Sequence, residues 1–102
     1  MQELNDDTIM AVIEKEPKVL IDFFASWCGA CRVAAPMFER VAKEFNIPIY
    51  KIDVEKNPKI KEMVELPGLP SVGGFKGGEP QDLVNITKEE AFREFVQNFS
   101  KS

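Results

Sequence analysis

The 102-residue sequence contains no histidine and only two cysteines. Without histidine, the chain lacks the Ser–His and Cys–His pairs that activate many catalytic nucleophiles. A zinc site needs about four nitrogen or sulfur ligands, so two cysteines would suffice only in a site shared between subunits. We therefore expect neither histidine-assisted nucleophilic catalysis nor a bound metal.

Long apolar runs and an excess of positive charge are also missing. Thirteen basic residues stand against seventeen acidic ones, for a net charge of −4, without the basic patch that binding to a phosphate backbone requires. No apolar run is long enough to cross a bilayer, and the polar start MQELNDDTIM lacks the basic-then-apolar pattern of a signal peptide. We predict a cytoplasmic protein that binds neither nucleic acid nor membrane, although the mature form of a precursor would read the same.

The length and composition are those of one globular domain. The hydrophobic share of 44% and the charged share of 29% are ordinary for such a domain. A chain of this length buries enough surface to fold without a disulfide or a metal. No repeat, low-complexity segment or linker divides it, so we expect residues 1–102 to form a single domain.

Local patterns predict strands and helices in alternation. The nearly continuous apolar run at 18–25 is typical of a strand buried on both faces, and the helical spacing of apolar residues over 29–45 predicts a helix, kinked at Pro36. The remaining predicted elements are a very short first strand, a helix at 5–15, a strand at 49–54, a short helix at 58–65, a hairpin from 71 to about 86, and a last helix. This order indicates an α/β fold with a largely parallel sheet covered on both faces.

Two of the predicted helix starts carry capping patterns. Asn5 is a candidate N-cap for the first helix, with Asp6 and Asp7 in the first turn, where negative charge suits the helix dipole. Thr87 and Glu90 have the spacing of a capping box before the last helix.

The stretch SWCGACR at 26–32 carries the chemistry of the chain. Two thiols at positions i and i+3 reach each other across a turn that enters a helix, where free N–H groups and the dipole lower the pKa of Cys28. We expect Cys28 to attack and the more enclosed Cys31 to resolve, while Gly29 and Ala30 leave room for a substrate and Arg32 adds positive charge. Besides the shared zinc site, two other interpretations of the cysteines compete with this one. A purely structural disulfide is one, but closing so short a loop would remove little conformational entropy from the unfolded chain. Two buried thiols without a joint function are the other.

Asp22 lies in the middle of the apolar run that leads to this motif. Burial of a carboxylate in such a strand should raise its pKa, so that the group can take a proton near neutral pH, as a base for Cys31 requires. An aspartate in water at a strand edge is the alternative, and the neighbouring cysteines favour the functional interpretation.

The segment VLIDFFASWCGACRVAAP resembles the active-site segment of thioredoxins, and the likeness extends over essentially the whole chain. It implies the thioredoxin fold, a five-stranded mixed sheet of order 1-3-2-4-5 flanked by four helices, and thiol–disulfide exchange through a mixed disulfide. Trp27 matches the family motif together with both cysteines and Gly29, and Asp22 matches the buried acid behind them. Lys51 matches the partner of that acid; a solvated lysine is the alternative.

The stretch LPGLPSVGGFKGG at 66–78 acquires a role through the same resemblance. Pro70 matches the family's cis-proline, which faces the cysteine pair and presents backbone groups to a client strand. Leu69 and Gly68 are then expected to form an apolar recognition rim, with pairing of the β-augmentation type.

Three features depart from the family pattern. Ala30 stands where the family commonly has proline. Its N–H is expected to bond the Cys28 sulfur and stabilise the reduced form, which would make the disulfide more oxidising than in a Gly-Pro counterpart. Gly73 and Gly74 replace bulky aliphatics, so either neighbouring side chains fill the gap or the strand is bulged. Asn85 replaces a glycine near the site, where it is expected to narrow the client groove or add a hydrogen bond to it.

The resemblance also implies the reaction partners. Cys28 attacks a client disulfide, Cys31 releases the reduced client, and a thioredoxin reductase, flavin-type or ferredoxin-linked, restores the dithiol. No cofactor is expected beyond the Cys28–Cys31 disulfide itself, and the protein is expected to act as a monomer. The alternatives are a more oxidising oxidase or isomerase of the same fold, and a docking module whose cysteines are incidental.

Overall fold

The computed structural model describes residues 1–102, and its elements follow the predicted order. They are β1 (Glu3–Leu4), α1 (Ile9–Lys15), β2 (Lys18–Phe24), α2 (Gly29–Glu44), β3 (Ile49–Asp53), α3 (Pro58–Met63), β4 (Ser71–Lys76), β5 (Glu79–Asn85) and α4 (Glu89–Lys101). Each predicted helix and strand is therefore present, with shifts of a few residues at its ends. No helix is long and apolar enough to span a membrane.

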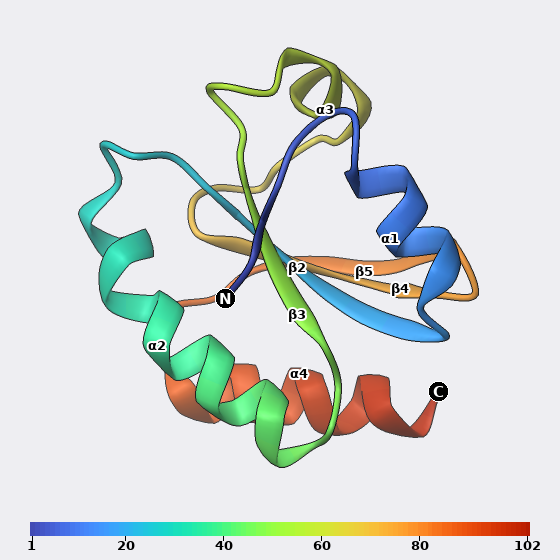
Figure 1. Ribbon diagram of the computed structural model, residues 1–102. Helices are drawn as coiled ribbons and strands as arrows, with labels where there is room; N and C mark the ends of the chain where they lie inside the picture. The colour runs from blue at the N-terminus through green and yellow to red at the C-terminus, as the bar shows by residue number, and fades with distance from the viewer.

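The five strands form one mixed sheet of order β1-β3-β2-β4-β5, which confirms the predicted fold. β1, β3 and β2 run parallel, whereas β4 pairs antiparallel with both β2 and β5. Helices α2 and α4 lie side by side along one face of the sheet, and α1 and α3 lie on the other side (Figure 1). The central strand β2 ends at the turn that leads into α2, which is where the cysteines lie.

Two apolar cores lie on the two faces of β2, because successive strand residues point to opposite sides. Leu20 belongs to the core under α2 and α4, whereas Val19, Ile21 and Phe23 belong to the core under α1 and α3. Strand alternation therefore places Asp22 on the same face as Leu20, toward α2. The prediction of a strand buried on both faces is confirmed, since residues 19–23 are all buried.

The start of α1 differs from the prediction. The side-chain oxygen of Asn5 does accept the N–H groups of Asp7 and Thr8, but the regular helix begins only at Ile9, and its first turn contains no acidic residue. Asp6 instead accepts the N–H groups of Lys59 and Ile60, at 3.1 and 2.9 Å. Its carboxylate thus caps α3, a long-range contact that satisfies donors at the start of that helix.

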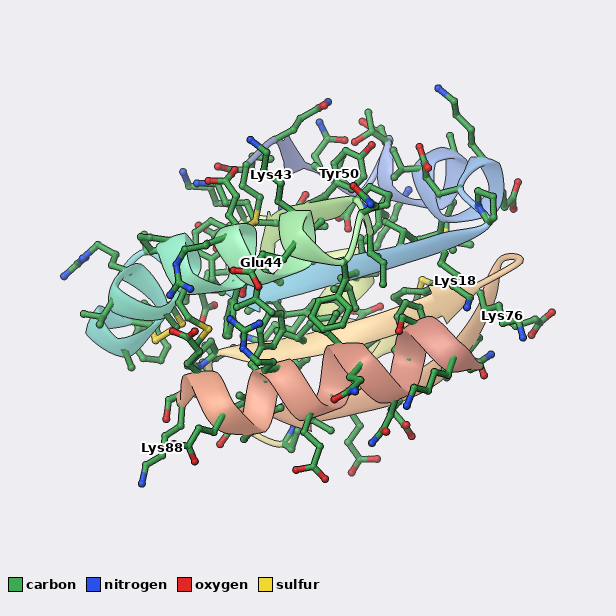
Figure 2. All side chains as sticks on the ribbon, turned by 90° about the horizontal axis from the view of Figure 1, so that it is seen from below. Lys18, Lys43, Glu44, Tyr50, Lys76 and Lys88 are labelled. Carbon is green, nitrogen blue, oxygen red and sulfur yellow. A yellow bond between two sulfur atoms is a disulfide. The ribbon has the colours of Figure 1, made fainter.

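The predicted capping box of α4 is wrong. The N-cap position is Lys88, and no side chain caps this helix. The first-turn residue Glu89 accepts hydrogen bonds from Arg40 of α2, at 2.6 and 3.1 Å, and from Arg93 at 3.0 Å. Arg93 also donates to Glu44, which lies between α2 and α4 in Figure 2. The start of α4 is therefore held to α2 by ion pairs and carries no side-chain cap.

The glycine pair of β4 lies where two aromatic rings approach the strand. A Cβ atom at Gly74 would meet the ring of Phe99 at 2.8 Å, and one at Gly73 would meet Phe23 at 3.2 Å. The pairing of β4 with β5 is also irregular between Gly73 and Phe75. Of the two predicted explanations, the filling of the space by neighbouring side chains is confirmed, and the irregular pairing accompanies it.

Candidate functional site

The two cysteines lie at the start of α2 and are joined in a disulfide, with their Cα atoms 5.3 Å apart. Cys28 is the N-cap of the helix, and its sulfur accepts the N–H of Cys31 at 3.1 Å. Cys28 is 6% exposed and Cys31 is 2% exposed. This position gives the Cys28 sulfur both a hydrogen-bond donor and the positive end of the helix dipole, which favour its thiolate.

The residues between the cysteines leave the sulfur pair approachable. Gly29 and Ala30 are exposed, and a Cβ atom at Gly29 would meet nothing within 4 Å. In this oxidised state the donor to the Cys28 sulfur is the N–H of Cys31; the bond expected from the Ala30 N–H belongs to the reduced form and stays a prediction. The bond from Cys31 follows regular helix geometry, because an N-cap side chain accepts from the second or third N–H of the helix.

Asp22 is buried beneath the disulfide, with 1% of its surface exposed. Burial raises the pKa of its carboxyl group from 3.8 to about 7, and the charge of Lys51 opposes this rise. The oxygen Oδ1 of Asp22 has no hydrogen-bond partner in the protein. A buried carboxyl group with an unpartnered oxygen and a pKa near neutrality is suited to exchanging a proton.

A cavity of about 390 Å³ connects Asp22 to Cys31, and Lys51 also lines it. Asp22 and Lys51 are register partners on the parallel strands β2 and β3, so their side chains share one face. The ammonium group of Lys51 lies 5.5 Å from the centre of the Phe24 ring, within the range of a cation–π interaction. The cavity thus brings the buried acid, Lys51 and Cys31 to one shared space.

The segment before β4 lies against the disulfide. The Leu69–Pro70 peptide bond is cis, as the resemblance implied, and Pro70 is buried. Leu69 packs on the cluster formed by Ala25, Cys28 and Cys31. The structure therefore brings this segment and the cysteine pair together.

Trp27 and Asn85 lie at the border of this region. Trp27 is 68% exposed, so its ring is available to a partner rather than buried as a cover for the site. The Nδ2 of Asn85 donates to the carbonyl of Pro70 at 2.6 Å. Asn85 thus contacts the cis-proline segment directly.

Three contributing residues were not predicted from the sequence. Phe24 and Glu39 line the cavity beside Asp22, and the hydroxyl of Ser71 donates to the carbonyl of Gly68. Strand alternation would have indicated Phe24, which lies two residues after Asp22. The other two contacts depend on how α2 packs on the sheet and on the shape of the segment before β4. No group of three or more acidic or cysteine side chains forms a metal-binding cluster.

Comparison with known proteins connects this geometry to a family. The thioredoxin family model matches residues 1–98. Thioredoxin 1 of Nostoc is 32% identical over 85 residues, which cover 80% of this chain and 79% of that protein. The chloroplastic M-type thioredoxin of spinach is 34% identical over 87 residues, covering 82% of this chain but 48% of its own length. This chain therefore spans about half of the spinach protein.

Solved structures agree in fold. A structure of Plasmodium falciparum thioredoxin superimposes with a TM-score of 0.89 at 23% identity, covering 96% of this chain and 98% of the other. At this low sequence identity, the structural similarity shows the fold alone. The family is shown by the family model, which covers nearly the whole chain and includes the Cys-x-x-Cys pair. The chain belongs to the thioredoxin family.

Proposed function

We propose that this protein reduces disulfide bonds of client proteins by dithiol exchange, with Cys28 as the attacking cysteine. The single observation that carries the proposal is the Cys28–Cys31 disulfide at the start of α2, with a buried proton-accepting carboxyl group beneath it. Membership of the thioredoxin family, whose members are thiol–disulfide oxidoreductases, agrees with it.

The first step is attack of the Cys28 thiolate on a client disulfide. A bond forms between the Cys28 sulfur and one client sulfur, while the client disulfide breaks and its second sulfur leaves as a thiolate. The N–H of Cys31, 3.1 Å from the Cys28 sulfur in the oxidised protein, supports the choice of Cys28, because hydrogen bonds to an anion stabilise it.

The second step is attack of Cys31 on the Cys28 sulfur of the mixed disulfide. The Cys28–Cys31 bond forms, the remaining client thiolate leaves, and two electrons have passed from the dithiol to the client. Cys31 must lose its proton first, and we assign its acceptor as Asp22, whose pKa of about 7 lets it take and release a proton near neutrality. The shared cavity supports transfer through water, with Lys51 as a positioning charge.

The client is proposed to bind across the rim formed by Trp27, Gly29, Ala30 and the segment Gly68–Pro70. Leu69 packs against the cysteine cluster, and its backbone groups make no hydrogen bond within the chain. An extended client segment can therefore add to this edge through main-chain hydrogen bonds. The exposed indole of Trp27 supplies apolar contact area next to the disulfide.

The dithiol is restored by a thioredoxin reductase, of either the flavin-type or the ferredoxin-linked class. We propose that residues 1–102 act as a single monomeric domain and that the disulfide is the sole redox group. A reducing compartment such as the cytoplasm suits the reaction, because thiols are kept reduced there.

The test is dithiothreitol-driven reduction of the insulin disulfides by the wild-type protein and the Cys28→Ser and Cys31→Ser variants. We expect the wild type to accelerate the reaction and both variants to lose the acceleration. Ser26→Ala, a change in the same exposed turn, is the matched control and should retain it. Persistence of the acceleration in Cys28→Ser would contradict the proposal.

A further inference from the structure

The amide group of Asn85 lies flat against the segment that carries the cis-proline. A Cβ atom built on Gly68 would meet the Cγ, Oδ1 and Nδ2 atoms of Asn85 at 3.2, 3.3 and 3.4 Å. The Nδ2 donates to the Pro70 carbonyl at 2.6 Å, and this hydrogen bond determines which way the amide faces. The orientation of Asn85 is therefore defined by a contact with the client-facing segment.

The carbonyl groups on either side of Leu69 are both occupied from within the protein. Ser71 donates its hydroxyl to the Gly68 carbonyl, and Asn85 donates to the Pro70 carbonyl. By contrast, the N–H and C=O of Leu69 make no hydrogen bond within the chain. The side chains of Ser71 and Asn85 thus occupy the neighbouring carbonyl groups, and Leu69 is the residue whose backbone groups can still pair with an added strand.

The second polar atom of the Asn85 amide is free. Its Oδ1 accepts no hydrogen bond from any protein donor, since the side chain makes a single hydrogen bond, through Nδ2. The residue as a whole is exposed, and its Oδ1 lies 3.3 Å from the position that a Cβ atom of Gly68 would take. The hydrogen bond from Nδ2 to Pro70 fixes the amide and therefore also its oxygen. Such a preorganised acceptor loses less conformational entropy when it binds a donor.

We propose that Asn85 is a specificity-determining residue of the client groove: its Oδ1 accepts a backbone N–H from a client strand paired with Leu69. The inference rests on the proposed disulfide reductase activity and adds a hydrogen bond outside the cysteine chemistry. It predicts a preference for clients that present a free backbone N–H at one defined position near their cysteine. Clients with proline there are the disfavoured class, because proline has no N–H.

The experiment uses a disulfide-containing peptide client and a set of derivatives, each N-methylated at one residue flanking the cysteine. The wild type is compared with Asn85→Gly, which removes the amide and its bulk, and with Asn85→Leu, which keeps a side chain of similar size without polar atoms. Asn46→Gly is the matched control, since Asn46 is exposed after the end of α2 and already has a positive φ of 57°.

For the wild type and Asn46→Gly, we expect kcat/KM to be about fivefold to tenfold lower for one of the N-methylated peptides than for the unmodified peptide. This factor corresponds to the loss of one hydrogen bond. In both Asn85 variants, methylation at that position should no longer lower kcat/KM. Methylation at a position that pairs with Leu69 should lower it as in the wild type. Asn46→Gly should reduce bis(2-hydroxyethyl) disulfide, which has no peptide backbone, at the wild-type rate.

An identical pattern of penalties in the wild type and both Asn85 variants would overturn the inference. So would retention of the wild-type pattern in Asn85→Leu alone, because bulk rather than hydrogen bonding would then set the preference. Failure of the proposed function has a different signature, since the wild type itself would then reduce neither the peptides nor the small disulfide.

Discussion

Replacement of Asp22 by asparagine should stabilise the oxidised protein at neutral pH, by an amount that grows between about pH 4 and pH 7. Burial raises the pKa of Asp22 from 3.8 to about 7. The carboxyl group therefore keeps its proton in the folded protein up to about pH 7, whereas the unfolded chain loses it above about pH 4. Between these values the folded state binds the extra proton, so wild-type stability falls as pH rises.

The magnitude follows from the same pKa change. A tenfold change in proton affinity is worth about 1.4 kcal/mol, so a rise of about three pH units corresponds to about 4 kcal/mol. Asparagine does not titrate, and its own cost of burial is the same at every pH. The stability difference between the variant and the wild type should therefore increase by about 4 kcal/mol from pH 4 to pH 7 and stay constant above it.

The assay is urea unfolding of both oxidised proteins at pH steps from 4 to 8. Glu39, Glu44, Glu55 and Glu89 have lowered pKa values because of ion-pair partners, and their effects cancel in the difference between the two proteins. A stability difference that does not change with pH would refute the assignment of a buried, protonated Asp22.

Three further substitutions test the packing around the site. Gly74→Val should cost about 1–3 kcal/mol in thermal unfolding, because its Cβ atom would lie 2.8 Å from the ring of Phe99; a wild-type Tm would contradict this. Asp6→Ala should cost about 1–2 kcal/mol, because two N–H groups of α3 lose their acceptor, while the neighbouring Asp7→Ala, whose side chain makes no hydrogen bond, should leave Tm unchanged. Glu89→Gln should destabilise the protein slightly at pH 7 in low salt. The loss should disappear in about 1 M salt, and also as the pH falls from 4.5 toward 2, because arginine partners lower the pKa of Glu89 from 4.5 to about 2; a loss independent of salt and acid would show that the charge is not responsible.

The sequence predicted the elements whose patterns are local. The apolar run of β2 and the helical spacing of α2 indicated both elements, and the position of Asp22 within that run indicated its burial. The spacing of Cys28 and Cys31 indicated two thiols within reach of each other at a helix start, and the family resemblance implied the disulfide. The cis bond at Pro70 was predicted by the resemblance alone, because without it a peptide bond before proline is expected to be trans.

The features that escaped prediction depend on contacts between distant segments. The sequence places Asp6 in the first turn of α1, but the packing of α3 against the N-terminal segment gives its carboxylate two N–H partners at the start of α3. Thr87 and Glu90 have the spacing of a capping box, yet the helix begins after Lys88 without a side-chain cap, and its first residue, Glu89, pairs with Arg40 of α2. Asn85 reaches Pro70 only because the register of β4 and β5 places it opposite Ser71. Such contacts are set by tertiary packing, which overrides local patterns.

The central claim is that Cys28 forms the bond to the client and Cys31 breaks it. The most direct measurement is mass spectrometry of the covalent product after each of the reduced Cys31→Ser and Cys28→Ser variants reacts with a disulfide client. We predict a stable mixed disulfide on Cys28 in the first variant, and none in the second, whose Cys31 is 2% exposed in the oxidised protein. A client adduct that accumulates on Cys31 while Cys28 stays free would contradict the account.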